Sequence, residues 1–189
     1  MSKKKYLVFD VETSGFQPPA ARVAELAFQL IDEDGVVLTS YSNLVRPNGW
    51  TIPKSKFFID NGMSTERNLK LGVDIRLVLG AFSDALNQAD FVVAHNFTFD
   101  RKFMSHEFTA AGLKDDAVLL NTRPAKCTML GSEDYCALPG RYPGKYKWPK
   151  LEELHQKLFG CKFDGAHEAL SDVKATSKCL TELIRLKIM

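Results

Sequence analysis

The order of the secondary-structure signals is the feature that most restricts the fold of this chain. Three strand-like segments, residues 5–12, 23–31 and 36–45, follow one another directly, and the turn sequence Asp32-Glu33-Asp34-Gly35 joins the last two. Beyond them, helical and strand patterns alternate. Strands joined by short turns pair antiparallel, whereas strands separated by helices pair parallel. The sequence therefore predicts an α/β fold with a mixed sheet flanked by helices.

The second part of the chain supplies the helices and the last two strands of this fold. Asp74 is a suitable N-cap residue for the first helix, and Gly112 and Gly160 are suitable C-terminal signals for two others. The expected helices cover residues 74–88, 97–111, 151–160 and 168–187, and the expected strands cover residues 91–94 and 117–122. Together with the three successive strands at the start of the chain, these two strands predict a five-stranded sheet.

The composition is that of one globular domain, which we expect to span residues 1–189. Of these residues, 45% are hydrophobic, which is enough for a single core. There is no stretch of about 18 apolar residues, and the first apolar run is too short for a signal peptide. The cysteines lack the spacing of a zinc site and suit a reducing compartment. We therefore expect a cytoplasmic protein without a membrane segment.

The first strand ends in two carboxylates on one face. Side chains alternate along a strand, so Leu7, Phe9 and Val11 share one face while Asp10 and Glu12 share the other. Two neighbouring carboxylates repel each other unless a cation lies between them, and Mg²⁺ or Mn²⁺ takes carboxylate oxygens. Taken alone, an Asp-x-Glu sequence is more often a solvated strand end.

A third carboxylate follows the strand at residues 91–94. Asn96 is a good N-cap for the next helix, and Asp100 lies about one turn further on. On such a helix both side chains would point toward the end of the preceding strand. By themselves, Asn96 would be only a cap and Asp100 only a polar residue of the first turn. His95 is expected to be a strand-end residue without a role in the chemistry.

A histidine and a fourth carboxylate lie near the start of the final helix. His167 and Asp172 are five residues apart, which corresponds to about 140° around a helix of 3.6 residues per turn. They can converge only if His167 lies in the loop before the helix, which Gly165 would permit. A histidine with a pKa near 6.5 is neutral at pH 7 and can accept a proton from water. The alternative is a loop histidine that caps the helix.

These three motifs resemble those of the DnaQ-like 3′–5′ exonucleases of the DEDDh type, and the chain is in this respect similar to the exonuclease domain of the DNA polymerase III epsilon subunit. The matching segments are Phe9-Asp10-Val11-Glu12-Thr13, His95-Asn96-x-x-Phe99-Asp100 and His167-x-Ala169-x-x-Asp172. The sister class of the family has a tyrosine where this chain has Glu168, which favours the histidine type. The resemblance implies a ribonuclease-H-like mixed five-stranded sheet.

The resemblance also implies release of nucleoside 5′-monophosphates from a 3′ end with the help of two divalent metal ions, Mg²⁺ or Mn²⁺. The implied metal ligands are Asp10, Glu12, Asp100 and Asp172, and His167 is the implied proton acceptor. The expected substrate contacts in the motifs are Thr13, Asn96 and Phe99. One departure is the sequence Asn61-Gly62-Met63-Ser64, where family members often carry a His-Gly-Ile element.

A loop rich in cations and aromatic rings lies between the second and third motifs. The net charge of +2 is too small to indicate a nucleic-acid-binding protein by itself. Cations that bind phosphates and rings that stack on bases are, however, what a single-strand binding surface needs. In this loop the cations Arg141, Lys145, Lys147 and Lys150 alternate with the rings of Tyr142, Tyr146 and Trp148, and the contacts expected first are Arg141, Lys145, Tyr146 and Lys147. The alternative is an ordinary surface loop. The irregular segment 47–63 is a second region considered for contact with substrate.

Two other functions are weighed against a DNA exonuclease. A non-catalytic adaptor of a polymerase complex would be expected to lose at least one ligand position, and none is lost. An exoribonuclease that trims short RNA shares the metal chemistry, and only contacts with the 2′-OH would distinguish it. The resemblance favours single-stranded DNA as substrate, although the sequence alone does not decide between DNA and RNA. The sequence also leaves open whether the chain acts alone, pairs with a second copy of itself or belongs to a polymerase complex.

Overall fold

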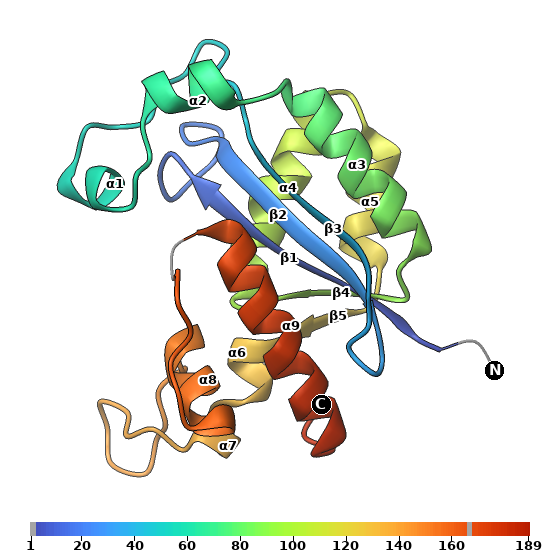
Figure 1. Ribbon diagram of the computed structural model, residues 1–189, viewed down its shortest axis with the longest axis vertical. Helices are drawn as coiled ribbons and strands as arrows, with labels where there is room; N and C mark the ends of the chain where they lie inside the picture. The colour runs from blue at the N-terminus through green and yellow to red at the C-terminus, as the bar shows by residue number, and fades with distance from the viewer. Residues whose placement is uncertain (1–2, 166–167) are drawn as a thin grey trace.

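The computed structural model describes residues 3–165 and 168–189. They form a five-stranded sheet in the order β3-β2-β1-β4-β5, with helices on both faces (Figure 1). The strands are β1 (Lys5–Thr13), β2 (Val23–Asp32), β3 (Val37–Leu44), β4 (Phe91–Ala94) and β5 (Ala125–Cys127). β1, β2 and β3 pair antiparallel, whereas β4 pairs parallel with both β1 and β5. The predicted mixed sheet of five strands flanked by helices is confirmed.

Helices cover the two faces of the sheet unequally. One face packs against α3 (Ile75–Gln88), α4 (Phe97–Ala110) and α5 (Lys114–Thr122), and the other packs against α9 (Ala169–Arg185) (Figure 1). The shorter helices are α1 (Lys56–Asp60), α2 (Thr65–Leu71), α6 (Thr128–Gly131), α7 (Glu133–Cys136) and α8 (Leu151–Phe159). In the part of the chain that the structure describes, no helix has both the length and the apolar character needed to cross a membrane.

The alternation predicted for β1 determines which side chains enter each core. Leu7, Phe9 and Val11 are buried in the core beneath α3 and α4. Tyr6 and Val8 are buried in the core beneath α9. Asp10 and Glu12 continue the pattern of the second set and therefore lie on the α9 side of the sheet.

Most of the predicted element boundaries are confirmed. Asp74 caps α3 and accepts a hydrogen bond from the backbone N–H of Arg76 at 2.8 Å. Gly112 follows α4, and Gly160 ends α8 in the left-handed conformation, with φ of 72°. Glycine adopts this conformation without a steric penalty, which explains why it ends helices so often.

The strand predicted at residues 117–122 is wrong, because this segment belongs to helix α5. Ala117 and Leu120, three residues apart, are buried, whereas Val118 is 60% exposed, as expected for a helix with one face on the core. A short apolar run does not distinguish a strand from a helix by periodicity. The strand of this region is β5, which begins directly after Pro124. The segment 47–63 is also less irregular than predicted, since it contains α1.

A buried ion pair joins the start of β2 to α4. Glu107 is only 2% exposed, and its carboxylate accepts two hydrogen bonds from the guanidinium of Arg22, at 2.8 and 2.6 Å. It also accepts the backbone N–H of Val23 at 3.2 Å. This paired and bonded arrangement is what allows a carboxylate to be buried. It holds the second strand against the helix that carries Asp100.

Candidate active site

The site lies where the parallel pairing of β1 and β4 ends. The two strands pair along Tyr6 to Val8 of β1, and β1 then continues beyond the last paired residue. Asp10 and Glu12 lie on this continuation, at the carboxyl ends of the parallel strands. In open α/β sheets this edge forms the crevice in which ligands bind. Asp100 reaches it from α4, and Asp172 reaches it from α9.

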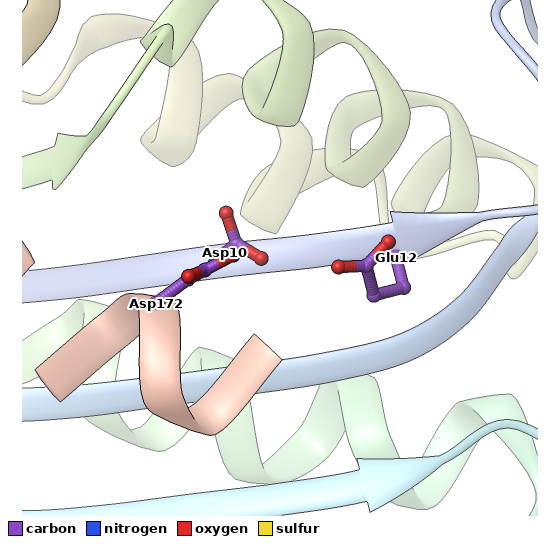
Figure 2. Close-up of side chains that lie close together, drawn as sticks. All are labelled: Asp10, Glu12 and Asp172. Carbon is purple, nitrogen blue, oxygen red and sulfur yellow. The ribbon is translucent and has the colours of Figure 1, made fainter. Parts of the chain in front are cut away.

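Three of the four predicted metal ligands form a compact group. Asp10, Glu12 and Asp172 each offer a carboxylate oxygen, and these oxygens lie within 4.8 Å of one another. Figure 2 shows the Asp172 side chain meeting β1 at Asp10, with Glu12 further along the strand. Hard divalent cations bind oxygens at about 2.0–2.6 Å, so one ion can bridge oxygens separated by about this distance. Residues more than 150 positions apart in the sequence are thus brought together as predicted.

Asp100 joins this group from the opposite side of β1. Its side chain is only 3% exposed, and its Oδ1 accepts the backbone N–H of Val11 at 3.1 Å. Val11 lies between Asp10 and Glu12, so the bond fixes Asp100 beside both. Its negative charge contributes to raising the pKa of each. Asp100 is therefore part of the same electrostatic cluster.

The carboxyl groups of the cluster have strongly perturbed acidities. Burial raises the pKa of Asp10 well above its ordinary value, and the charges of Asp100 and Glu12 raise it further. Burial, followed by the charges of Asp172 and Glu25, raises the pKa of Glu12 to about 8. Burial also raises the pKa of Asp100 to about 8, although the bond from Val11 opposes the shift.

These shifts indicate what the cluster binds. Buried carboxylates that repel one another are stabilised by protonation or by a cation between them. The donor set of Asp10, Glu12 and Asp172 consists of oxygen atoms alone, which suits hard divalent cations rather than thiolate-binding metals. The site is therefore fitted to hold divalent metal.

Glu25 is a neighbour of the site that sequence patterns did not reveal. It lies opposite Glu12 in the antiparallel pairing of β1 and β2. Its carboxylate accepts a hydrogen bond from the hydroxyl of Ser42 at 3.1 Å, and burial raises its pKa. Only the register between the two strands places Glu25 here, because its spacing from the motifs carries no signal.

The residues expected to contact substrate within the motifs lie in different surroundings. Thr13 is buried, and its hydroxyl donates to the backbone carbonyl of Gly15 at 2.6 Å. Phe99 is half-buried and packs against Phe103, with ring centroids 5.0 Å apart. Phe16 was not predicted, but it is 83% exposed in the loop after β1, four residues beyond Glu12.

The predicted side-chain cap by Asn96 is wrong. Asn96 occupies the N-cap position of α4, but its backbone is left-handed, with φ of 76°, and its side chain makes no capping bond. The turn between β4 and α4 is only two residues long, and asparagine tolerates the left-handed conformation better than most residues. Asn96 is exposed, whereas Asp100 is buried against β1, so their environments differ.

The cationic loop lies between α7 and α8. Arg141, Lys145, Tyr146 and Lys147 are all exposed, and the ammonium of Lys147 pairs with Glu153 at 2.5 Å. None of these four residues lines the recess beside Asp172 described below. The later part of the same loop does line it.

The structure describes only one of the two histidines of the motifs. His167, the expected proton acceptor, lies outside the described residues. His95 bonds to the hydroxyl of Thr128 and to the carbonyl of Pro149, both at 3.0 Å. Burial lowers the pKa of His95 to about 4, so it is neutral at pH 7. Its place is structural, which agrees with the expectation that it takes no part in the chemistry.

The fold and the carboxylate cluster together define a class of protein, a mixed-sheet hydrolase with a divalent-metal site suited to phosphodiester bonds. Residues 7–180 match the family model described as Exonuclease. Because this match covers most of the chain, the chain belongs to the exonuclease family. The family resemblance of the three motifs is confirmed.

Curated relatives agree with this family. The chain is 29% identical over 189 residues to the 3′-5′ exonuclease DinG of Bacillus subtilis (strain 168), covering 97% of this chain and 18% of that protein. It is 28% identical over 180 residues to the PolC-type DNA polymerase III of Streptococcus suis (strain 98HAH33), covering 95% of this chain and 11% of that protein. The chain thus spans less than a fifth of the length of either relative.

Solved structures share the fold. E. coli exonuclease I in complex with a dT13 oligonucleotide matches with a TM-score of 0.77 at 17% identity, over 98% of this chain and 43% of that chain. The zinc-bound form of the E. coli exonuclease I complex with single-stranded DNA matches with a TM-score of 0.78 at 18% identity, over 98% and 41% of the two chains. At this identity the likeness shows the fold.

Proposed function

We propose that the chain is a metal-dependent 3′–5′ exonuclease domain that hydrolyses phosphodiester bonds at the 3′ end of single-stranded DNA and releases nucleoside 5′-monophosphates. The observation that carries the proposal is the convergence of Asp10, Glu12 and Asp172 to within 4.8 Å beside the buried Asp100. The exonuclease family and the activity named for the DinG relative support the reaction and its direction.

Each carboxylate has a role in this proposal. Two divalent ions, Mg²⁺ or Mn²⁺, would be held by Asp10, which both would share, and by Glu12, Asp100 and Asp172, which would complete their binding or orient the ligands. Two ions bound there would lower the pKa of a water and stabilise the charge on the attacking and leaving oxygens. His167 accepts the proton of that water. Bound metal would also neutralise the electrostatic repulsion among the four neighbouring carboxylates.

The substrate contacts are proposed in two groups. Glu12 and Thr13 lie at the end of β1 and contact the terminal nucleotide, and Asn96 and Phe99 lie nearby on the turn and first turn of α4. The cationic loop supplies phosphate and base contacts through Arg141, Lys145, Tyr146 and Lys147. The oligonucleotide complexes of exonuclease I support single-stranded DNA as the ligand.

The unit of function is proposed to be one exonuclease domain over residues 1–189. The PolC-type relatives carry a similar segment within a DNA polymerase, which supports a polymerase as one partner and leaves a second copy of the chain as the other. A cytoplasmic setting is supported by the four cysteines, all of which are free: Cys127, Cys136, Cys161 and Cys179.

The proposal is tested by incubating the purified protein with Mg²⁺ or Mn²⁺ and matched 5′-labelled single-stranded DNA and RNA. We expect a ladder that shortens from the 3′ end, absent with EDTA and absent in the Asp10→Ala variant. Asp84→Asn, an exposed carboxylate on α3 beneath the other face of the sheet, is the matched control and should behave as the wild type. Preference for RNA would favour the exoribonuclease alternative, and no degradation of either would favour an adaptor.

A further inference from the structure

A recess of about 460 Å³ reaches the carboxylate cluster at Asp172, and neither Glu12 nor Thr13 lines it. Its lining includes Asn96, Trp148, Lys150, Phe163 and Asp172. We call it the Trp148 recess. Its volume lies within the range of sites that bind small molecules or parts of larger ligands. The metal chemistry proposed above does not use it.

The walls of the recess are suited to a flat, uncharged group. Trp148 is 61% exposed, which is unusual for so large an aromatic side chain. Phe163 is half-buried and packs against His155, with ring centroids 5.4 Å apart. Aromatic rings at a surface of this kind provide faces on which nucleobases stack.

The position of Trp148 is held by a bond between distant parts of the chain. The carbonyl of Pro149 can only accept a hydrogen bond, so Nε2–H of His95 donates to it at 3.0 Å. Nδ1 of His95 then accepts the hydroxyl of Thr128, also at 3.0 Å. Since His95 directly follows β4, this bond ties the residue after Trp148 to the sheet. The recess is therefore fixed relative to the carboxylate cluster.

The charges around the recess indicate which part of a nucleotide it takes. Lys150 is exposed at the recess and offers an ammonium group to a phosphate. Glu152 also lines the recess and disfavours a second anion inside. A neutral base in the recess avoids the charge of Glu152. The phosphates of the same nucleotide can then lie at the metal site and at Lys150.

We propose that the Trp148 recess binds the base of the nucleotide on the 5′ side of the scissile bond, stacked on Trp148. This inference rests on the proposed function, in which Glu12 and Thr13 hold the terminal nucleotide at the end of β1. Asp172 and Asn96 line the recess whereas Glu12 and Thr13 do not, so the recess is left for the neighbouring nucleotide. A base stacked there is separated from any complementary strand. The substrate class is therefore an unpaired 3′ end of at least two nucleotides.

The catalytic test combines a change in the protein with a change in the substrate. Single-stranded DNA with either an ordinary or an abasic residue next to the 3′ terminus is digested with Mg²⁺, and kcat/KM is measured for the first cleavage. Loss of the base should lower the wild-type value about 5- to 150-fold, the range for stacking one base on an aromatic ring. Trp148→Ala should lose a similar factor on the intact strand and little more on the abasic strand.

Two variants separate stacking from damage to the loop. Trp148→Phe keeps a ring and should keep most of the sensitivity to the abasic residue. Tyr142→Ala removes an equally exposed ring of the same loop that does not line the recess, and it should match the wild type on both strands. An abasic penalty that remains complete in Trp148→Ala would overturn the inference, as would an equal loss in Tyr142→Ala.

A binding measurement tests the recess independently of hydrolysis. The chain has two tryptophans, so Trp50→Phe leaves Trp148 as the single tryptophan reporter of fluorescence. Titration with the intact oligonucleotide in EDTA should quench this fluorescence, and the abasic oligonucleotide should quench it much less. Equal quenching by the two oligonucleotides, or no quenching by either, would overturn the inference that the recess binds a base. Quenching by the intact oligonucleotide without any hydrolysis in Mg²⁺ would support base binding in the recess and refute the proposed function.

Discussion

The Glu12→Gln substitution should stabilise the metal-free protein at neutral pH while it impairs metal binding. Burial and neighbouring charges raise the pKa of Glu12 in the folded protein to about 8, above its ordinary value of 4.5. A carboxyl group with a raised pKa contributes stability fully below pH 4.5, and this contribution is lost as the pH rises through 8. Glutamine has no such dependence.

The magnitude follows from the same two acidities. At pH 7, Glu12 is protonated in the folded protein and ionised in the unfolded chain, about 2.5 pH units above its unfolded pKa. At 1.36 kcal/mol per pH unit, folding of the wild type is disfavoured by about 3 kcal/mol relative to Glu12→Gln, and by less than about 1 kcal/mol at pH 5. The charge of Glu12 also contributes to raising the pKa of Asp10, which acts in the same direction.

Urea unfolding in EDTA at pH 5 and pH 7 measures this difference. The gap in unfolding free energy between the variant and the wild type should widen with pH, and saturating Mg²⁺ should stabilise the wild type more than the variant. Glu33→Gln, at an exposed carboxylate in the turn after β2, is the matched control and should show no widening gap. Parallel pH dependence of wild type and Glu12→Gln would refute the electrostatic reasoning.

Four further substitutions test other parts of the structure. Glu107→Ala should lower the unfolding free energy by about 3–5 kcal/mol, because Arg22 loses its buried partner; Arg22→Ala should behave similarly, and a loss below 1 kcal/mol in urea would count against this. Asp100→Asn can still accept the N–H of Val11 and removes a buried carboxyl with a raised pKa, so it should not lower the unfolding free energy, yet it should lose more than about 100-fold in kcat; full activity would contradict its place at the metals. His167→Ala should lose about 10²–10⁴-fold in turnover but still bind Mn²⁺ in calorimetry, and loss of Mn²⁺ binding would argue against a role as proton acceptor.

Sequence reasoning succeeded where a local pattern determines the geometry. The alternation along β1 predicted that Asp10 and Glu12 share a face, and the core residues Leu7, Phe9 and Val11 occupy the opposite face as expected. The glycine that ends α8 follows from backbone freedom at that residue. Such features depend on neighbouring residues alone.

Other features depend on contacts between distant residues and were missed. The five residues of α1 are too few to show helical periodicity, and the apolar residues of α5 are compatible with either a helix or a strand. Glu25 is placed beside Glu12 by strand register, which the sequence does not display. In the cationic loop, the bond from His95 to Pro149 determines that Trp148 rather than Tyr146 borders the recess.

We propose that the carboxylate cluster removes single nucleotides from a 3′ end with the help of divalent metal. The most direct measurement is product analysis on single-stranded DNA labelled at its 3′-terminal nucleotide, with wild type and Asp10→Asn, in Mg²⁺ and in EDTA. We expect the wild type to release the label first and only as a nucleoside 5′-monophosphate. This release should occur in Mg²⁺ and not in EDTA. Release in EDTA, release by Asp10→Asn at the wild-type rate, or release of a longer fragment would contradict it.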